Sequence, residues 1–262
     1  MPKLAANLTT MVGEAPFLDR FALAARAGFR AVEFQFPYEF EIADIRDRLA
    51  DNGLRLVLFN MPPGDWRTGE RGIAALPGRE SEFRDGVARS LDYALDLGCT
   101  RLHALAGLTP DGADAQRMRD TYLANLRYAA QFAAVSEVEV LIEPISRESI
   151  PGYFLDVLSM AADIVDEAGE ANLFIQYDLF HQRFRGEDLV SPYLDHAQTI
   201  RHVQVAGWPH RQEPDAGAPE WRAAFEALDA AGYDGFVGCE YWPAGDTEAG
   251  LGWAAPWLKG QA

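Results

Sequence analysis

The sequence predicts an α/β protein built as a single (β/α)8 barrel over residues 1–262. Its length of 262 residues suits this fold, which typically needs ~250 residues. One unit recurs five times along the chain: an amphipathic helix, then a glycine, then a short apolar strand. Three more apolar segments bring the expected strands to eight, and no linker or low-complexity segment interrupts the pattern. We therefore expect one domain.

The elements are placed by hydrophobic periodicity, which switches between the period of a helix and that of a strand. The expected strands are residues 3–7, 31–35, 54–59, 101–105, 139–142, 173–177, 200–205 and 236–239. The expected helices are residues 17–27, 42–52, 82–97, 115–133, 156–168, 191–197, 221–231 and 248–258. The glycines that follow five of these helices are Gly28, Gly53, Gly98, Gly169 and Gly232. Glycine favours the left-handed cap at the end of a helix, so the repeated junctions predict a parallel sheet. An open, doubly wound sheet is the alternative, but no G-x-G-x-x-G motif follows the first strand.

The charge balance disfavours two classes of partner. The chain has 40 Asp and Glu against 23 Lys and Arg, a formal net charge of -17. Such a chain repels phosphate backbones and anionic lipids, so we expect no nucleic acid and no membrane as partners. A small-molecule substrate is the expected partner, and assembly into a homo-oligomer is left open. Cys99 and Cys239 are too few for a disulfide framework, which favours a reducing, cytoplasmic setting.

Four successive strands end in an oxygen-bearing side chain. Glu143, Asp178 and Glu240 directly follow apolar strand segments, and Gln204 lies near the end of the strand 200–205. Active sites of (β/α)8 barrels lie at the C-terminal ends of the strands, so we expect these side chains to converge. Three carboxylates in one place repel one another unless a cation offsets them. An all-oxygen ligand set suits a hard divalent ion, Mn²⁺ or Mg²⁺. The alternative is that these acids are solvated loop residues. The occurrence of such a residue at the ends of four successive strands argues against this alternative.

Seven segments carry a family resemblance. They are LIEPI at 141–145, QYDLFH at 176–181, HVQV at 202–205, GCEY at 238–241, VEFQFPY at 32–38, NMPPGDW at 60–66 and GERG at 69–72. In combination they resemble the hydroxypyruvate isomerase family, which includes the 2-oxo-tetronate isomerases. The resemblance covers essentially the whole chain and implies a xylose-isomerase-like barrel.

The resemblance also implies the chemistry. Glu143, Asp178, Gln204 and Glu240 match the metal-ligand positions of the family, and the two glutamates would exchange protons with the substrate. The expected reaction interconverts hydroxypyruvate and tartronate semialdehyde, or a related 2-oxo-tetronate, through an enediolate that a divalent metal stabilises. A ketose 3-epimerase or another carbohydrate isomerase on the same metal site is the alternative, because epimerisation also needs two bases.

Further residues are expected to contact the substrate. His181 and Arg211 match substrate-contacting positions of the family. His181, three residues after Asp178 and on the loop after the sixth strand, would donate to a substrate hydroxyl; a packed loop histidine is the alternative. The substrate carboxylate needs a cation, and Arg211 or Arg71 could pair with it.

Residues 60–79 form a long connection rich in Gly and Pro, and loops of this length are usually functional or disordered. We expect a lid that excludes water, with Asn60 and Trp66 among the substrate-binding residues; a loop ordered by Trp66 packing alone is the alternative. Phe59 and Leu108 depart from the family pattern, which carries His and Lys there, so the exact substrate stays open. A nuclease on the same barrel is disfavoured by five histidines and the negative charge. A non-catalytic binding protein is disfavoured by the intact ligand set.

Overall fold

The fold is a closed barrel of parallel strands, as the sequence predicts. The computed structural model describes residues 2–186, 188–215 and 217–259, and in these ranges eight strands are ordered β1 to β8 around the barrel. Neighbouring strands pair in parallel. Chain contacts divide the structure into two compact units, one of Met1–Val57 with Tyr177–Ala262 and one of Leu58–Gln176. The fold class expected from the sequence is confirmed.

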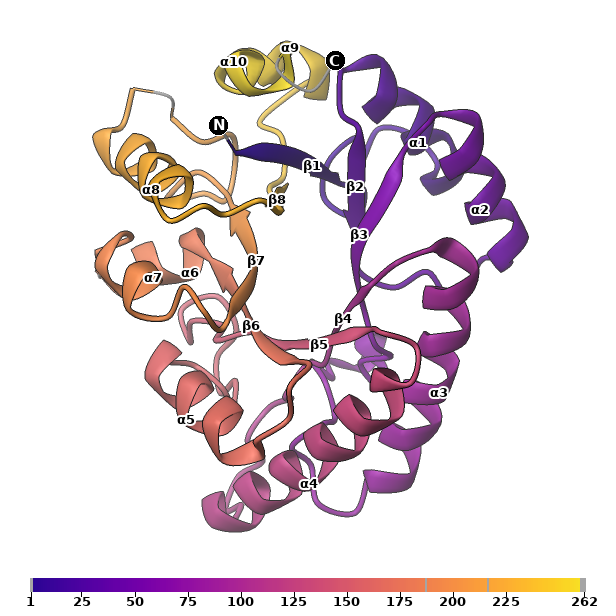
Figure 1. Ribbon diagram of the computed structural model, residues 1–262, viewed down its shortest axis with the longest axis vertical. Coiled ribbons are helices and arrows are strands. Elements are labelled where there is room, and N and C mark those ends of the chain that lie inside the picture. The colour runs from indigo at the N-terminus through magenta and orange to yellow at the C-terminus, as the bar shows by residue number, and fades with distance from the viewer. Residues whose placement is uncertain (1, 187, 216, 260–262) are drawn as a thin grey trace. The chain divides into compact units, whose positions relative to one another are not determined.

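The first unit joins the two ends of the chain. Its complete strands are β1 (Lys3–Asn7), β2 (Ala31–Phe34), β7 (Ile200–Val205) and β8 (Phe236–Cys239). Its helices are α1 (Phe17–Arg26), α2 (Ile42–Asp51), α6 (Leu179–Phe184), α7 (Ser191–Asp195), α8 (Pro219–Ala230), α9 (Thr247–Gly250), η2 (Leu251–Trp253) and α10 (Ala255–Leu258). Helices α1 and α2 lie side by side (Figure 1). Strands β3 (Arg55–Asn60) and β6 (Leu173–Asp178) cross the division between the units.

Strand register in the first unit brings polar side chains together. Strand β1 pairs with β2 so that Asn7 lies opposite Glu33, and β7 pairs with β8 so that Gln204 lies opposite Gly238. Side chains alternate between the two faces of a strand, so His202 and Gln204 share one face of β7. Ala5, on the same strand as Asn7, belongs to a buried cluster of small hydrophobic side chains with Ala31 and Val57.

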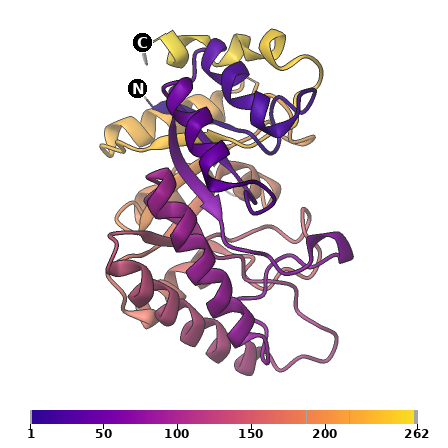
Figure 2. The same ribbon diagram turned by 90° about the vertical axis from the view of Figure 1, so that its right-hand side faces the viewer.

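The second unit has the longest helices. Its elements are η1 (Trp66–Thr68), α3 (Glu80–Leu97), β4 (Arg101–His103), α4 (Ala115–Ala134), β5 (Glu139–Ile142) and α5 (Leu158–Ala168). Helices α3 and α4 lie side by side in both ribbon views (Figures 1 and 2). Their buried faces carry apolar residues at helical spacing, such as Phe83, Val87 and Leu91 on α3. Burial of these faces, rather than helix propensity, supplies most of the stability of such helices.

Most of the expected elements are confirmed, with bounds that shift by one or two residues at an end. Gly98 and Gly169 cap α3 and α5 in the left-handed conformation, with φ of 64° and 69°. Two expectations are wrong. The helix expected at 248–258 is three short elements, because glycines and Pro256 interrupt the helical pattern. The segment after β6, expected as a loop, is the helix α6.

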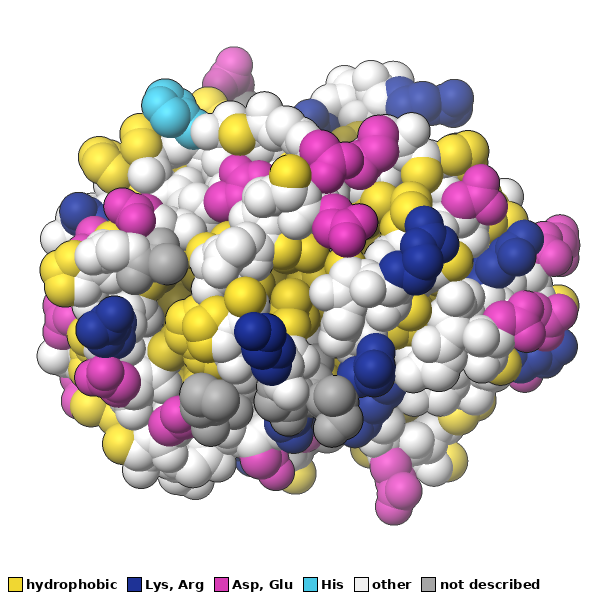
Figure 3. Space-filling model, turned by 90° about the horizontal axis from the view of Figure 1, so that it is seen from above, with side chains coloured by type: hydrophobic (Ala, Val, Ile, Leu, Met, Phe, Trp, Pro, Cys, Tyr) yellow, Lys and Arg dark blue, Asp and Glu magenta, His cyan; other side chains and the backbone are white. Residues whose placement is uncertain are grey.

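The helices and one face of the molecule show how apolar and charged side chains are distributed. Among the described residues, no helix combines the length and the apolar character needed to cross a membrane. On the face drawn in Figure 3, acidic and basic side chains are interspersed.

Candidate functional site

The four side chains expected to bind a metal are all buried at or just beyond strand ends. Asp178 is the last residue of β6, and Gln204 is the penultimate residue of β7. Glu240 directly follows β8, and Glu143 directly follows β5. The exposed fractions of Asp178, Gln204, Glu240 and Glu143 are 2%, 2%, 7% and 4%. Burial at this depth is costly for a carboxylate unless a cation or several hydrogen bonds compensate it, so none of these is a solvated loop acid.

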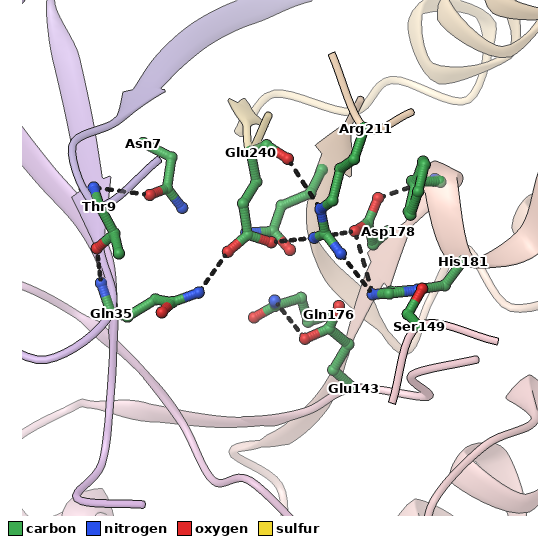
Figure 4. A network of polar contacts seen from close by, with 12 residues as sticks. Asn7, Thr9, Gln35, Glu143, Ser149, Gln176, Asp178, His181, Arg211 and Glu240 are labelled. Carbon is green, nitrogen blue, oxygen red and sulfur yellow. Dashed lines mark hydrogen bonds and ion pairs between the residues drawn. The ribbon is translucent and has the colours of Figure 1, made fainter. Parts of the chain in front are cut away.

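In the first unit, one guanidinium bridges two of these carboxylates (Figure 4). Arg211 Nη2 donates to Asp178 Oδ2 at 3.0 Å and to Glu240 Oε2 at 2.7 Å. Its Nε donates to the backbone oxygen of Glu240 at 3.2 Å. The other carboxylate oxygen of Glu240 accepts from Gln35 Nε2 at 3.0 Å. The positive charge of Arg211 is therefore shared between two buried acids.

The loop after β7 holds Arg211 in place. Its backbone φ is +53°, in the left-handed region, and its carbonyl accepts from the backbone N–H of Trp242 at 2.9 Å. The guanidinium lies over the rings of Phe180 and Trp242, 4.9 and 5.8 Å from their centroids. Cation–π contacts of this kind add to the ion pairs in keeping the cation beside the acids.

Burial controls protonation in this cluster. It raises the pKa of Glu240 to about 7, against the opposing charge of Arg211. Burial also raises the pKa of Asp178, again opposed by Arg211. The pKa of His181 lies well below its ordinary value, because burial and the neighbouring Arg211 both disfavour an imidazolium. A neutral imidazole adds no positive charge to the cluster. A further cation would therefore favour the ionised forms of the two acids.

His181 lies on α6, and not on the loop that the sequence suggests. The side chain of Asp178 caps this helix, with Oδ1 accepting from the backbone N–H of Phe180 at 2.8 Å. An aspartate at this position is a typical helix start. The resulting turn brings His181 Nε2 to 3.5 Å from Asp178 Oδ2 and 3.3 Å from Arg211 Nη1. The loop expectation fails because Asp178 both ends the strand and begins a helix.

Glu143 is fixed by its neighbours within the second unit. Its Oε2 accepts from Gln176 Nε2 at 3.0 Å (Figure 4) and lies 3.7 Å from His103 Nδ1. Burial and the charge of Glu143 together raise the pKa of Tyr153. The Tyr153 hydroxyl accepts from the backbone N–H of Ala106 at 3.0 Å. Glu143 is therefore held in a buried environment of polar side chains.

Side chains of the kind that hold a metal ion occur in both units. The first unit offers the buried carboxylate of Asp178 and the imidazole of His181, and the second unit offers the buried carboxylate of Glu143. Glu240 and Gln204 add oxygen donors in the first unit. A donor set dominated by oxygen suits a hard divalent cation.

The substrate-binding residues expected on the loop after β3 are only partly brought together. Asn60 ends β3 and is buried, and Trp66 begins η1. The guanidinium of Arg71 stacks on the Trp66 ring, 4.1 Å from its centroid, and donates to the Trp66 carbonyl at 3.2 Å. Phe59 is buried in β3, and Leu108 forms an isolated bridge with the chain at 153.

The same loop is anchored at two further points. Arg79 forms ion pairs with two glutamates, from its Nη1 to Glu70 Oε1 and from its Nε to Glu82 Oε2, both at 2.6 Å. Gly72 has a φ of +114° and lies so close to Leu105 that a Cβ would overlap the Leu105 carbonyl. Trp66 packing alone therefore does not account for the order of this loop.

Two polar residues near β2 were missed by the sequence reasoning. Gln35 directly follows the strand, and its side-chain amide donates a hydrogen bond to Glu240. Glu33 lies inside β2, is 1% exposed, and accepts from His202 and Gln204. A signal was present in the sequence, since Glu33 is the ionisable residue of an otherwise apolar strand.

Comparisons with known proteins agree with this fold. The xylose isomerase-like TIM barrel family matches residues 21–261. A 2-oxo-tetronate isomerase from Cupriavidus necator is 51% identical over 258 residues, which cover 98% of this chain and 99% of that protein. The hydroxypyruvate isomerase of Escherichia coli is 45% identical, over 98% of this chain and 100% of that protein.

Solved structures extend the likeness. A crystal structure described as an AP endonuclease, family 2, from Brucella melitensis has a TM-score of 0.95 and 47% identity, over 98% of this chain and 99% of that one. A 3-keto-D-glucoside 4-epimerase from Escherichia coli shares the fold. Its TM-score is 0.81 and its identity 20%, over 98% of this chain and 100% of that one. By its sequence over nearly its full length, the chain belongs to the hydroxypyruvate isomerase and 2-oxo-tetronate isomerase family of xylose isomerase-like TIM barrels.

Proposed function

We propose that this protein is a metal-dependent isomerase of a short 2-oxo acid. The observation that carries the proposal is the pair of buried carboxylates, Asp178 and Glu240, that share the guanidinium of Arg211. Two acids beside one fixed cation retain a net negative charge in a buried place, which favours a divalent metal. Membership of the isomerase family supplies the reaction class.

The proposed metal ligands are Glu143, Asp178, Gln204 and Glu240, and the proposed ion is Mn²⁺ or Mg²⁺. The chemistry of the donor set fits such an ion, because carboxylate and amide oxygens are the ligands that hard cations prefer. The raised pKa values of Asp178 and Glu240 support the same assignment, since burial alone disfavours their charged forms and a bound cation would restore them. When bound, the ion would act as a Lewis acid that polarises the substrate carbonyl.

The proposed proton transfers use the two glutamates. For hydroxypyruvate, the carboxylate of one glutamate removes a proton from C3, and the other glutamate returns a proton to C2. A further proton moves from the C3 hydroxyl to the C2 oxygen. The C2 ketone becomes an alcohol, the C3 alcohol becomes an aldehyde, and no atom is gained or lost. A pKa of about 7 at Glu240 suits a group that both takes and gives a proton near neutral pH. Glu143 is the proposed partner.

Other side chains are proposed to bind the substrate. Arg211 or Arg71 would pair with the substrate carboxylate, and His181 would donate to a substrate hydroxyl. The buried, neutral state of His181 supports this role, because a neutral imidazole can donate one hydrogen bond and accept another. Asn60 and Trp66 are proposed to line the substrate site and to exclude water.

A substrate panel tests the proposal. Protein loaded with Mn²⁺ is assayed with hydroxypyruvate, with a 2-oxo-tetronate, and with free ketohexoses. We expect turnover of at least one of the two oxo acids and its loss in Glu240→Gln, whereas Glu226→Gln, at an exposed acid of α8, should retain it. Turnover of ketohexoses without either oxo acid would replace the proposal with a ketose 3-epimerase.

We also propose that residues 1–262 act as one catalytic domain in the cytoplasm. Cys99 and Cys239 are both buried as thiols, which supports a reducing setting.

A further inference from the structure

Glu33 is a buried carboxylate that the proposed chemistry does not use. It lies in the middle of β2, and its side chain is 1% exposed. Three polar side chains of the first unit surround it. Its Oε2 lies 2.6 Å from His202 Nε2, while its Oε1 accepts from Gln204 Nε2 at 2.7 Å and from Asn7 Nδ2 at 3.0 Å.

The chain is built to make room for this carboxylate. Gly238 on β8 lies so close to Glu33 that a Cβ there would overlap both carboxylate oxygens. Replacing a buried charged network by apolar residues of the same shape is often neutral or stabilising, so packing alone gives no reason for an acid at this position. The contacts of Glu33 therefore point to a role beyond filling space.

One of these contacts fixes the orientation of an amide. A glutamine side chain ends in a donor nitrogen and an acceptor oxygen of nearly the same shape. Gln204 Nε2 donates to Glu33 Oε1, so the nitrogen of this amide faces Glu33 and its oxygen faces the other way. Only the oxygen of a glutamine is a useful ligand for a hard cation.

We propose that Glu33 is a positioning residue that holds the Gln204 amide with its oxygen toward the metal. This inference rests on the metal site of the proposed function. His202 and Asn7 complete the arrangement, since each donates to Glu33 and limits the rotation of its carboxylate. Outer partners of metal ligands commonly fix ligand orientation in this way.

Exchanging donor and acceptor tests the proposal. In Glu33→Gln the new amide can pair with either end of the Gln204 amide, so the oxygen of Gln204 is no longer held toward the metal. We therefore expect Mn²⁺ affinity to fall about tenfold or more. Electron paramagnetic resonance or calorimetry measures this affinity. Gln204→Glu places two carboxylates against each other. In the double variant Glu33→Gln with Gln204→Glu, an amide and a carboxylate face each other again. Glu33→Gln should therefore lower Mn²⁺ affinity in the natural background and raise it in the Gln204→Glu background.

This reversal of sign separates positioning from simpler effects. If Glu33 acted only through its negative charge, its removal would lower Mn²⁺ affinity in both backgrounds. If it served only for stability, affinity would stay unchanged within about twofold in both, well below the usual effect of an outer partner. Either result would overturn the proposal.

A matched control makes the same substitution at Glu226, an exposed acid of α8. Glu226→Gln removes a carboxylate from the surface and should leave Mn²⁺ affinity nearly unchanged in both backgrounds. If Glu33→Gln does not fold, Glu33→Asp, which keeps the charge and shortens the reach, is measured in both backgrounds instead. Failure of the natural protein to bind Mn²⁺ would refute the proposed function itself, whereas binding without the reversal refutes only the role of Glu33.

Discussion

Glu240 should make the stability of the protein fall as pH rises, provided that a chelator keeps divalent metal away. Burial raises the pKa of Glu240 from its ordinary value of 4.5 to about 7. Between these values the folded protein holds a proton that the unfolded chain has released. The free energy of unfolding falls with pH wherever the folded state binds more protons. At about 1.4 kcal/mol per pKa unit, the shift of Glu240 corresponds to a loss of about 3 kcal/mol by pH 8.

The measurement is urea denaturation with chelator at pH 5, 6, 7 and 8 for the natural protein and for Glu240→Gln. The variant is needed because His181 acts in the opposite direction. Its pKa is lowered on folding, so the unfolded chain binds more protons below its ordinary value of 6.5, and stability rises as pH approaches that value. The glutamine cannot ionise, so the difference between the two curves isolates Glu240.

The expected result is a difference in unfolding free energy between the two proteins that changes by about 2.5 kcal/mol from pH 5 to pH 8, in favour of the variant at high pH. Parallel curves, with a difference that is constant within about 0.5 kcal/mol, would refute the assignment of a raised pKa to Glu240. Saturating Mn²⁺ should reverse the slope of the natural protein, because a bound cation favours the ionised carboxylate and lowers its pKa.

Three further predictions concern the same cluster. Arg211→Met should raise Mn²⁺ affinity, because the guanidinium occupies oxygens of Asp178 and Glu240, and it should also raise the KM for an oxo acid. Arg211→Lys keeps the positive charge and should leave Mn²⁺ affinity closer to that of the natural protein. Equal Mn²⁺ affinities in all three proteins would contradict this reasoning. Gly238→Ala should destabilise the fold by about 1–3 kcal/mol through overlap with Glu33, as measured by thermal denaturation, and an unchanged melting temperature would show that the carboxylate can move aside. Dialysis against a chelator should abolish turnover and Mn²⁺ should restore it, whereas full activity of the chelated protein would exclude a metal-dependent reaction.

Much of the fold was predictable because it repeats a local pattern. Each helix–glycine–strand junction is encoded within about fifteen neighbouring residues, and parallel strands joined by helices leave few possible topologies. The positions of Asp178 and Glu240 were predictable for the same reason, since a polar residue that ends an apolar strand is a local signal. Helix α6 was missed because Asp178 serves two elements, as the last residue of β6 and as the cap of the next helix.

The contacts within the site could not be predicted from local patterns. Glu33 and Gln204 are separated by 171 positions in sequence, and only the strand register brings them within 2.7 Å. The bridge from Arg211 to Asp178 and Glu240 depends on a loop backbone with positive φ at a non-glycine residue, for which the sequence carries no strong signal. Side-chain networks of this kind are properties of the folded chain.

The most direct test of the proposed isomerase is the fate of hydrogen during turnover in D₂O. Mn²⁺-loaded protein is incubated with hydroxypyruvate, and the product is examined by proton nuclear magnetic resonance. Proton transfer through two glutamates predicts tartronate semialdehyde that carries solvent deuterium at C2, and no product from Glu240→Gln or from chelated protein. Product whose C2 hydrogen comes from C3 of the substrate, without solvent deuterium, would contradict proton exchange through two carboxylates. Absence of product from both hydroxypyruvate and a 2-oxo-tetronate would contradict the isomerase itself.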